Sequence, residues 1–274
     1  MTNPFSYEGR RVIVTGGSRG VGAALLEVLA ELDAAHVTVI DLNAPSGAHD
    51  VFIRTDLGDE AAVREAIGSI DAPVHALFNN AGVADTSPPR TVIAVNYLAL
   101  RSFTEGLLDS MSEGGAIVNT ASMAGNLWKK RAEQIDELLS LDLADGWTPS
   151  LMWFEEQAAA LDQGPYNFSK EIVERYTQRL SRPLISRGLR INSVCPGPID
   201  TPLLRDFRAT SGDQINDWMI REMAGRPVSA REVASVLAFL GSPGASYING
   251  SNVDIDGGFA AAAATRQVDY SGRT

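Results

Sequence analysis

A tyrosine and a lysine stand four residues apart in the segment Tyr166-Asn-Phe-Ser-Lys170, at the start of a long helical pattern. Four residues along a helix place both side chains on one face. An ammonium group beside a phenol stabilises the phenolate and lowers the tyrosine pKa from about 10, as a general base for an alcohol proton requires. Because such pairs are also common on solvated helix faces, other polar residues must point to the same place.

Ser122 and Asn96 supply two such groups. Ser122 comes just past a predicted strand, so we expect it at the carboxyl edge of the sheet, where its hydroxyl could donate a hydrogen bond to a substrate carbonyl oxygen. No glycine elbow surrounds it, which argues against a hydrolase. Asn96 lies inside a helical pattern, where a lone asparagine is usually a satisfied core amide. It could instead interrupt the helix and hold a water that feeds a proton relay.

The segment Thr15-Gly-Gly-Ser-Arg-Gly-Val-Gly22 lies between a predicted strand and a predicted helix. Glycines there let the backbone turn tightly and approach a pyrophosphate at a helix N-terminus. A glycine-rich turn alone is weak evidence, but this placement favours a nucleotide site. The expected contact residues are Gly16, Ser18, Arg19, Gly20, Val21 and Gly22.

Asp41 ends the second predicted strand, with Leu42 after it. A carboxylate there can accept hydrogen bonds from ribose hydroxyls and repels a 2′-phosphate. Arg19 is either a solvated loop residue or a partner for that phosphate. Since no basic residue follows Asp41, the sequence predicts NAD(H) in preference to NADP(H). Asp56 and Leu57, after the third strand, are expected at the adenine edge, although an isolated Asp in such a turn is more often a helix cap.

Short β-branched runs alternate with longer helical stretches along the chain. Their nearly continuous apolar character predicts strands that are buried on both faces and paired in parallel through right-handed crossovers. We therefore expect one α/β domain over residues 1–274, a doubly wound seven-stranded sheet with helices on both faces. The expected strands are Arg11–Thr15, His36–Asp41, Val51–Ile53, Val74–Phe78, Ala116–Thr120, Arg190–Val194 and Asn252–Ile255.

These residues together resemble the classical short-chain dehydrogenase/reductase family, whose fold is Rossmann-type. The resemblance covers essentially the whole chain and rests on Thr15 to Gly22, Asp56, Asn79 to Gly82, Asn96, Ser122, Tyr166, Lys170, Pro196-Gly197 and Val253-Asp-Ile-Asp-Gly-Gly258. It implies hydride transfer between a nicotinamide ring and a carbinol carbon.

The family resemblance also implies roles for individual residues. Tyr166 would be the acid/base, Lys170 would bind the nicotinamide ribose and tune Tyr166, Ser122 would orient the substrate and Asn96 would support the relay. The stretch after the sixth strand matches the part of the family that contacts the nicotinamide and its carboxamide. Further cofactor contacts are therefore expected at Asn80, Ala81, Gly82, Pro196, Gly197, Ile199 and Thr201.

Two segments interrupt the strand and helix pattern, residues 123–165 and 203–225. The first is longer than the family's usual separation of serine and tyrosine. Its apolar helical stripes predict an aromatic and aliphatic wall over the nicotinamide, unless they pack on each other or on a neighbouring subunit. The second predicts a mobile apolar lid. Substrate contacts are expected at Ser122, Trp153, Tyr166, Leu203, Leu204, Trp218 and Met219.

The long serine-to-tyrosine segment resembles a branch that contains 3α-hydroxysteroid dehydrogenase/carbonyl reductase and coniferyl-alcohol dehydrogenase. It implies a secondary or bulky apolar alcohol, alicyclic, steroid-like or aromatic, and its ketone. Two alternatives stay open, an epimerase or dehydratase on the same scaffold and an NAD-sensing regulatory protein. The resemblance further implies a homotetramer or homodimer. The tail, residues 260–274, either reaches a neighbouring active site or frays.

The composition favours a small-molecule ligand. A net charge of −11 repels phosphate backbones and anionic lipid, so nucleic-acid and membrane-surface partners are not expected. The single cysteine, Cys195, excludes an intramolecular disulfide, and three scattered histidines give no zinc-ligand cluster, so no metal site is predicted. With no apolar run long enough for a signal peptide or membrane span, we expect a soluble cytoplasmic protein.

Overall fold

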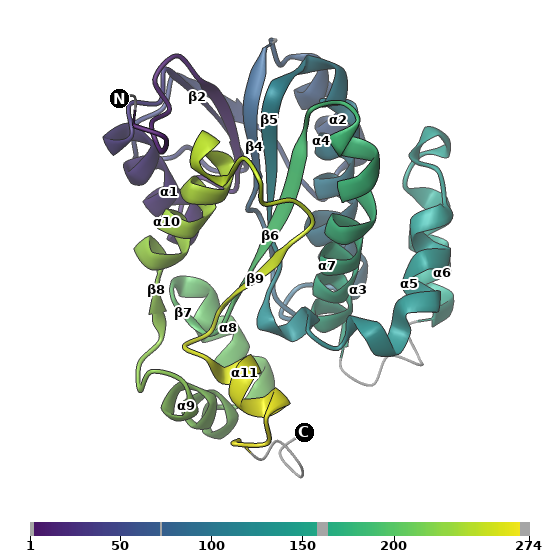
Figure 1. Ribbon diagram of the computed structural model, residues 1–274. Coiled ribbons are helices and arrows are strands. Elements are labelled where there is room, and N and C mark those ends of the chain that lie inside the picture. Colours follow the sequence, from purple (N-terminus) through teal and green to yellow (C-terminus); the bar gives the residue numbers. More distant parts are fainter. Residues whose placement is uncertain (1–2, 72, 158–163, 269–274) are drawn as a thin grey trace.

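The computed structural model describes residues 3–71, 73–157 and 164–268. Within them, seven parallel strands form one sheet in the order β3-β2-β1-β4-β5-β6-β9 (Figure 1), so the predicted doubly wound sheet is confirmed. The strands are β1 (Arg11–Thr15), β2 (His36–Asp41), β3 (Val51–Arg54), β4 (Val74–Asn79), β5 (Met111–Thr120), β6 (Arg190–Pro196) and β9 (Asn252–Ile255).

The strand order reverses between β1 and β4. The chain runs outward from β1 through β2 to β3, then returns to place β4 on the other side of β1. In such sheets ligands bind beyond the carboxyl ends of the strands at the point of reversal. The central strands are buried on both faces, as their apolar sequences predict. The bounds of β1, β2 and β9 are as predicted, whereas β3, β4, β5 and β6 are longer, most of all β5 at its start.

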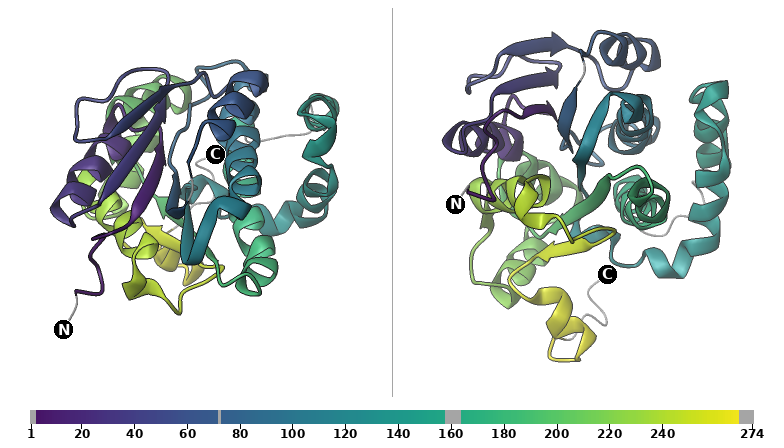
Figure 2. Two further views of the ribbon diagram at one scale, coloured as in Figure 1. Left: turned by 90° about the horizontal axis from the view of Figure 1, so that it is seen from above. Right: turned by 45° about the horizontal axis from the view of Figure 1, so that its top comes forward.

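Helices cover both faces of the sheet (Figure 2). One face packs against α1 and α10, and the other against α2, α3, α4 and α7, with a buried apolar cluster under each layer. The helices are α1 (Gly20–Glu31), α2 (Glu60–Gly68), α3 (Pro89–Ile93), α4 (Leu100–Gly106), α7 (Gly164–Ile185) and α10 (Ala230–Gly241). A Ser229–Glu232 capping box begins α10, so its start is fixed locally.

The inserted segment forms the helices α5 (Ala132–Ser140) and α6 (Thr148–Gln157), which lie outside the layer of α3 and α7 (Figures 1 and 2). The expectation that they form a wall over the nicotinamide is therefore wrong. Their apolar stripes instead face α7, with Ile135, Leu138 and Phe154 fully buried. Residues 158–163 of this segment, and 269–274 of the tail, lie outside the described residues.

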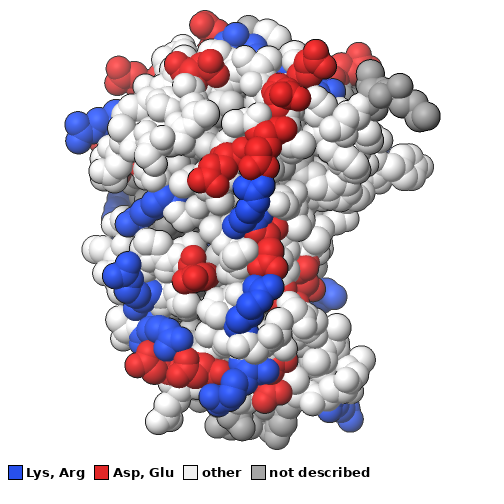
Figure 3. Space-filling model, turned by 90° about the vertical axis from the view of Figure 1, so that its left-hand side faces the viewer, with Lys and Arg blue, Asp and Glu red and all other residues white. Residues whose placement is uncertain are grey.

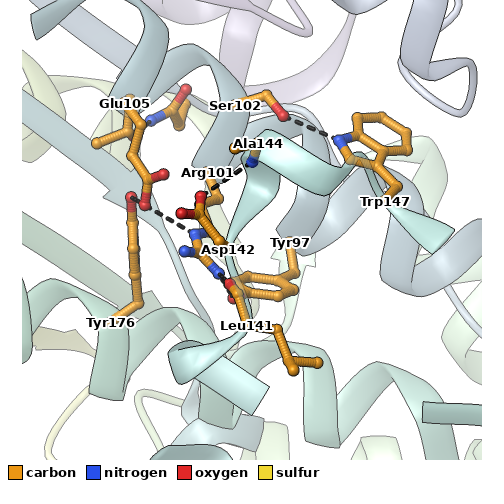
Figure 4. Close-up of polar contacts among 11 residues, drawn as sticks. Tyr97, Arg101, Ser102, Glu105, Leu141, Asp142, Ala144, Trp147 and Tyr176 are labelled. Carbon is orange, nitrogen blue, oxygen red and sulfur yellow. Dashed lines mark hydrogen bonds and ion pairs between the residues drawn. The ribbon is translucent and has the colours of Figure 1, made fainter. Parts of the chain in front are cut away.

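The link between α5 and α6 is fixed to α4 by hydrogen bonds (Figure 4). The Arg101 guanidinium donates to the Leu141 carbonyl oxygen at 2.9 Å, and the Trp147 indole N–H donates to the Ser102 hydroxyl at 2.9 Å. Arg101 is buried and also pairs with Glu105 at 2.7 Å. Each contact satisfies a buried polar group, which is the condition for burying it at low cost.

Three helices follow β6 beyond the carboxyl edge of the sheet: α8 (Pro202–Ser211), α9 (Asp213–Glu222) and α11 (Phe259–Ala264). They flank a short second sheet of β7 (Ile199–Asp200) and β8 (Val228–Ser229). Among the described helices, none combines the length and apolar character that crossing a membrane would need.

Candidate active site

A large cavity of about 1610 Å³ lies along the carboxyl ends of the strands. Its walls come from the glycine loop, the ends of β2 to β6, the first turns of α7, and the helices beyond β6. Nearly all of the predicted cofactor residues line it. They are Gly16, Ser18, Arg19, Gly20, Val21, Asp41, Leu42, Asp56, Leu57, Asn80, Ala81, Gly82, Tyr166, Lys170, Pro196, Gly197, Ile199 and Thr201.

The glycine loop has the backbone geometry that a bound phosphate needs. Gly16 has φ +71°, and a Cβ there would lie 2.6 Å from the Ala81 Cα. Gly22 does not line the cavity, but a Cβ on it would clash with the Gly16 carbonyl oxygen, so this glycine permits the turn. Since α1 begins at Gly20 with no acidic side chain in its first turn, its free amides favour an anion.

Asn80 joins the loop to the sheet. Its side-chain amide nitrogen donates to the Gly16 carbonyl oxygen at 3.0 Å, and its side-chain oxygen Oδ1 accepts from the Thr120 hydroxyl at 3.4 Å. Its backbone N–H donates to the Thr15 hydroxyl at 3.1 Å. The ends of three strands are thus tied together at the reversal point. This fixes the loop before any ligand binds.

The Asp41 carboxylate lies at the opposite end of the cavity from Tyr166. Each of its oxygens accepts one backbone N–H, from Ser18 at 2.9 Å and from Asn43 at 3.0 Å. Each oxygen keeps a lone pair for a further donor such as a sugar hydroxyl. Arg19 is exposed beside it and lines the same cavity.

Tyr166, Lys170 and Ser122 come together at the inner end of the cavity. Tyr166 and Lys170 lie one turn apart on α7, with the Lys170 ammonium 5.7 Å from the centre of the Tyr166 ring. Lys170 is buried and donates to the Thr120 carbonyl oxygen at 2.8 Å. The Ser122 side chain is close enough to the Tyr166 phenol to lower its pKa. Tyr166 and Lys170 therefore share one face of α7, as their spacing predicts.

Burial dominates the titration of both groups. It raises the pKa of Tyr166 to about 12, opposed by the hydrogen bond from Ser122. It lowers the pKa of Lys170 to about 8. The expected lowering of the tyrosine pKa by Lys170 is not seen in this structure, where loss of solvent around the phenol is the largest cause of the shift.

Asn96 lies in a π-helical turn, Ala94–Ala99, between α3 and α4. Its side-chain oxygen accepts from the Val83 N–H at 2.8 Å, and its amide donates to the Val83 carbonyl at 3.0 Å and to the Ser169 hydroxyl at 3.0 Å. The predicted interruption of the helix is confirmed. The side chain couples this turn to the loop after β4 and, through Ser169, to α7.

The helices beyond β6 cover the substrate side of the cavity. Leu203, Leu204 and Met219 line it as predicted. Phe207 on α8 meets the Tyr166 ring edge-on, with the ring centres 4.7 Å apart. Trp218 is not among the lining residues, because it packs against Phe259 on α11 with an exposed fraction of 5%.

Trp153 also lies away from the cavity. Its indole stacks on Phe168 of α7 at a centre-to-centre distance of 6.2 Å, within the apolar cluster of that face. The expectation of a substrate contact at Trp153 is therefore wrong. Of the described residues of the inserted segment, 123–124 and 126–130 line the cavity.

The comparisons agree with this geometry. A model of the short chain dehydrogenases matches residues 10–132, and one described as enoyl-(acyl carrier protein) reductase matches residues 151–260. The coniferyl-alcohol dehydrogenase of Pseudomonas sp. (strain HR199 / DSM 7063) is 34% identical over 92% of this chain and 96% of its own length. The chain belongs to the short-chain dehydrogenase/reductase family. It is accordingly an oxidoreductase scaffold with the Rossmann-type sheet described above.

Two solved structures of the short-chain dehydrogenase/reductase family are similar in both sequence and fold. The 3-alpha-hydroxysteroid dehydrogenase from Pseudomonas sp. B-0831, complexed with NADH, is 30% identical with a TM-score of 0.74, covering 94% of this chain and 99% of its own. A short chain dehydrogenase from Burkholderia cenocepacia J2315, in complex with NADP, is 26% identical with a TM-score of 0.67, covering 94% and 100%.

Three polar residues at the site of this family member were missed by sequence reasoning. Asp85 accepts the Tyr166 backbone N–H at 2.8 Å, and Ser169 donates to the Tyr166 carbonyl oxygen at 2.7 Å. Glu174, one turn beyond Lys170, is buried and lines the cavity. Burial raises its pKa to about 8. Its spacing of four from Lys170 is the signal that could have found it.

Proposed function

We propose that the protein is a nicotinamide-dependent dehydrogenase that interconverts a secondary or bulky apolar alcohol and its carbonyl compound. The observation that carries this proposal is the meeting of Tyr166, Ser122 and Lys170 at the inner end of one cavity whose other end is a glycine loop. The relatives named above act on coniferyl alcohol and on 3-alpha-hydroxysteroids, which supports the substrate class.

The residues present fit a dinucleotide. The close approach of Gly16 to Ala81 leaves a cradle without side chains, and the start of α1 offers backbone amides to a pyrophosphate. Asp41 would hold the adenosine ribose, and Lys170 the nicotinamide ribose. When bound, the oxidised nicotinamide supplies a hydride acceptor and a positive charge.

In this proposal Tyr166 holds and moves the proton. During alcohol oxidation its phenolate would accept the hydroxyl proton, and during carbonyl reduction its phenol would return one. Ser122 donates a hydrogen bond to the substrate oxygen and holds it beside the phenol. Lys170 is fixed by Thr120 and contributes positive charge whenever it is protonated, which its lowered pKa near 8 permits at neutral pH.

We further propose NAD(H) in preference to NADP(H). Asp41 would lie against a 2′-phosphate, and both of its oxygens are held in place by backbone N–H groups, so it cannot easily turn aside. Arg19 is exposed to solvent, which weakens any ion pair that it would form with a 2′-phosphate. Relatives bind either cofactor, as the NADH and NADP complexes named above indicate.

The test of the function is oxidation of an alcohol panel with NAD⁺, followed by the absorbance of reduced nicotinamide. Coniferyl alcohol, a 3α-hydroxysteroid and 1-phenylethanol are expected to be oxidised. Activity confined to small polar sugars or to acyl thioesters would contradict the substrate class. No turnover in either direction with either cofactor would contradict the enzyme itself.

A further inference from the structure

Lysine is rare in this sequence and is confined to one place in the structure. The chain has three lysines, Lys129, Lys130 and Lys170, and all of its other cationic side chains apart from histidine are arginines. All three lysines line the cavity. Lys170 is buried at the inner end, whereas Lys129 and Lys130 are exposed. The two exposed lysines have no role in the proposed hydride transfer.

The short helix that carries them is anchored by its other face. Residues Trp128–Arg131 form one 3₁₀ turn, in which positions three apart lie on the same side. Trp128 packs under the Arg175 guanidinium at 5.1 Å, and Arg131 pairs with the buried Glu171 at 2.6 Å. Because these two residues hold the turn on α7, Lys129 and Lys130 project away from it. Lys129 rests with its ammonium 5.8 Å from the centre of the Trp128 ring.

The described part of the chain offers these two ammonium groups no carboxylate within ion-pair distance. Several arginines elsewhere in the described residues do have such a carboxylate partner. On the face formed by α1, α9 and α10, basic and acidic side chains alternate (Figure 3), and Arg208, Arg226 and Arg231 each pair with a carboxylate. Among the described residues, Lys129 and Lys130 thus present two adjacent cationic groups to the cavity of a chain whose net charge is −11.

Four carboxylates share the cavity with the lysines. Asp41 and Asp56 lie at the adenosine end, beside the glycine loop. Glu174 and Asp254 also line the cavity, but burial raises the pKa of both, that of Glu174 to about 8, so that Glu174 is mostly neutral at pH 7. Glu174 therefore opposes little of the positive charge that Lys129 and Lys130 place at this rim of the cavity.

We propose that Lys129 and Lys130 bind an anionic group, a carboxylate or a phosphate, carried by the substrate away from its carbinol carbon. This inference rests on the proposed function and narrows its substrate class. An ammonium is a compact point charge on a flexible stem, which suits an anion whose position varies between substrates. The apolar lid would hold the body of the substrate while the rim holds its charged end.

The experiment compares three secondary alcohols that share one reacting group: 4-(1-hydroxyethyl)benzoate, its methyl ester and 1-phenylethanol. A series with zero, two or four methylenes before the carboxylate shows which distance between the carbinol carbon and the anion gives the lowest KM. A phosphate monoester of the same length shows whether a carboxylate or a phosphate is preferred. We expect the anionic members to have a KM at least several-fold below the ester's, with similar kcat, and that advantage to shrink as salt is raised.

Substitutions of Lys129 and Lys130 test whether these residues cause the lower KM of the anionic substrates. Lys129→Gln with Lys130→Gln is expected to raise the KM of the anionic substrates about tenfold and to leave that of the ester unchanged. The charge-conserving pair Lys129→Arg and Lys130→Arg should retain the preference. Arg64→Gln with Arg182→Gln removes the same charge from exposed positions outside the cavity and should change nothing.

The outcomes separate this inference from the function on which it rests. Equal KM values for ester and anions, unaffected by the glutamine pair, would overturn the inference while the proposed function stands. A preference that survives the glutamine pair would overturn the assignment to these lysines. If no member of the series, charged or neutral, is oxidised, the proposed function and this inference both fail.

Discussion

Helix α7 is contacted from two sides by very different structures. On the cavity side, Tyr166, Lys170 and Glu174 face the ends of the strands through hydrogen bonds and buried charge. On the outer side, Phe168 and Arg175 face the inserted helices α5 and α6, through ring stacking and ion pairs such as Arg175–Asp136 at 2.7 Å. Because an α-helix has 3.6 residues per turn, positions 166, 170 and 174 lie on one side of α7 and positions 168 and 175 on the other.

The difference between the two sides of α7 indicates which part of the insertion can influence the reaction. The catalytic residues come from strand ends and from the first turns of α7, which the sheet positions without help from the added helices. Because α5 and α6 contact α7 from behind, they can support its position but cannot touch a substrate. Among the described residues of the insertion, 123–124 and 126–130 lie on the cavity side, so their contribution to substrate selection must act there.

The largest effect should come from the outer side and act on stability. Trp153→Ala removes an indole that stacks on Phe168, and we expect it to lower the free energy of unfolding by about 3–5 kcal/mol. The activity of the folded fraction should stay near that of the wild type. Urea unfolding with parallel assays measures both. Met152→Ala, at a neighbouring position that is 54% exposed, is the matched control and should change little.

The next effect belongs to the cavity side and acts on rate. Ser122→Ala removes a hydrogen-bond donor aimed at the substrate oxygen, and kcat is expected to fall about 10²–10³-fold. The melting temperature should hardly change, since only one hydroxyl is lost. Steady-state kinetics and thermal unfolding check the two halves of this prediction. A large loss of stability with a normal kcat would show that Ser122 serves folding rather than catalysis, which would contradict the contrast between the two sides of α7.

A smaller change is expected at the adenosine end. Asp41→Asn keeps the size of the side chain but removes the charge that would repel a 2′-phosphate, so the ratio of kcat/KM for NAD⁺ to that for NADP⁺ should fall about tenfold or more. The measurement is the same ratio in wild type and variant. A wild-type preference for NADP⁺ would make the cofactor assignment wrong.

The smallest effect is on the pH dependence of stability. The pKa of Glu174 is raised by burial from 4.5 to about 8, so folding favours its protonated form. The stability it contributes is complete below pH 4.5 and is lost progressively as pH rises through 8. Relative to Glu174→Gln, the wild-type melting temperature should therefore fall by several degrees between pH 5 and 8. Parallel changes in both proteins would disprove the assignment.

Much of this could be predicted from the sequence, for physical reasons. Strands such as Ile13-Val14 and Ile117-Val118 are apolar on both faces, so their burial in a parallel sheet follows directly. Polar residues that directly follow such strands, among them Asn80 and Ser122, must then meet at one edge. The spacing of Tyr166 and Lys170 fixes their common face wherever the helix packs.

The features that could not be predicted from the sequence depend on tertiary packing. The apolar stripes of α5 and α6 indicate that one face is buried but not what covers it, which is why Trp153 was assigned to the cavity. Trp218 was misplaced for the same reason. The pKa of Tyr166 could not be read from its neighbour Lys170 alone, since the loss of solvent around a phenol depends on the whole fold.

The central claim is that Tyr166 carries the proton in the reaction. With an alcohol that the wild type oxidises, Tyr166→Phe should reduce the rate of NAD⁺ reduction by roughly 10²–10⁴-fold. The dissociation constant of NADH, measured by its fluorescence, should stay close to that of the wild type. A rate near that of the wild type, with cofactor binding intact, would contradict the account.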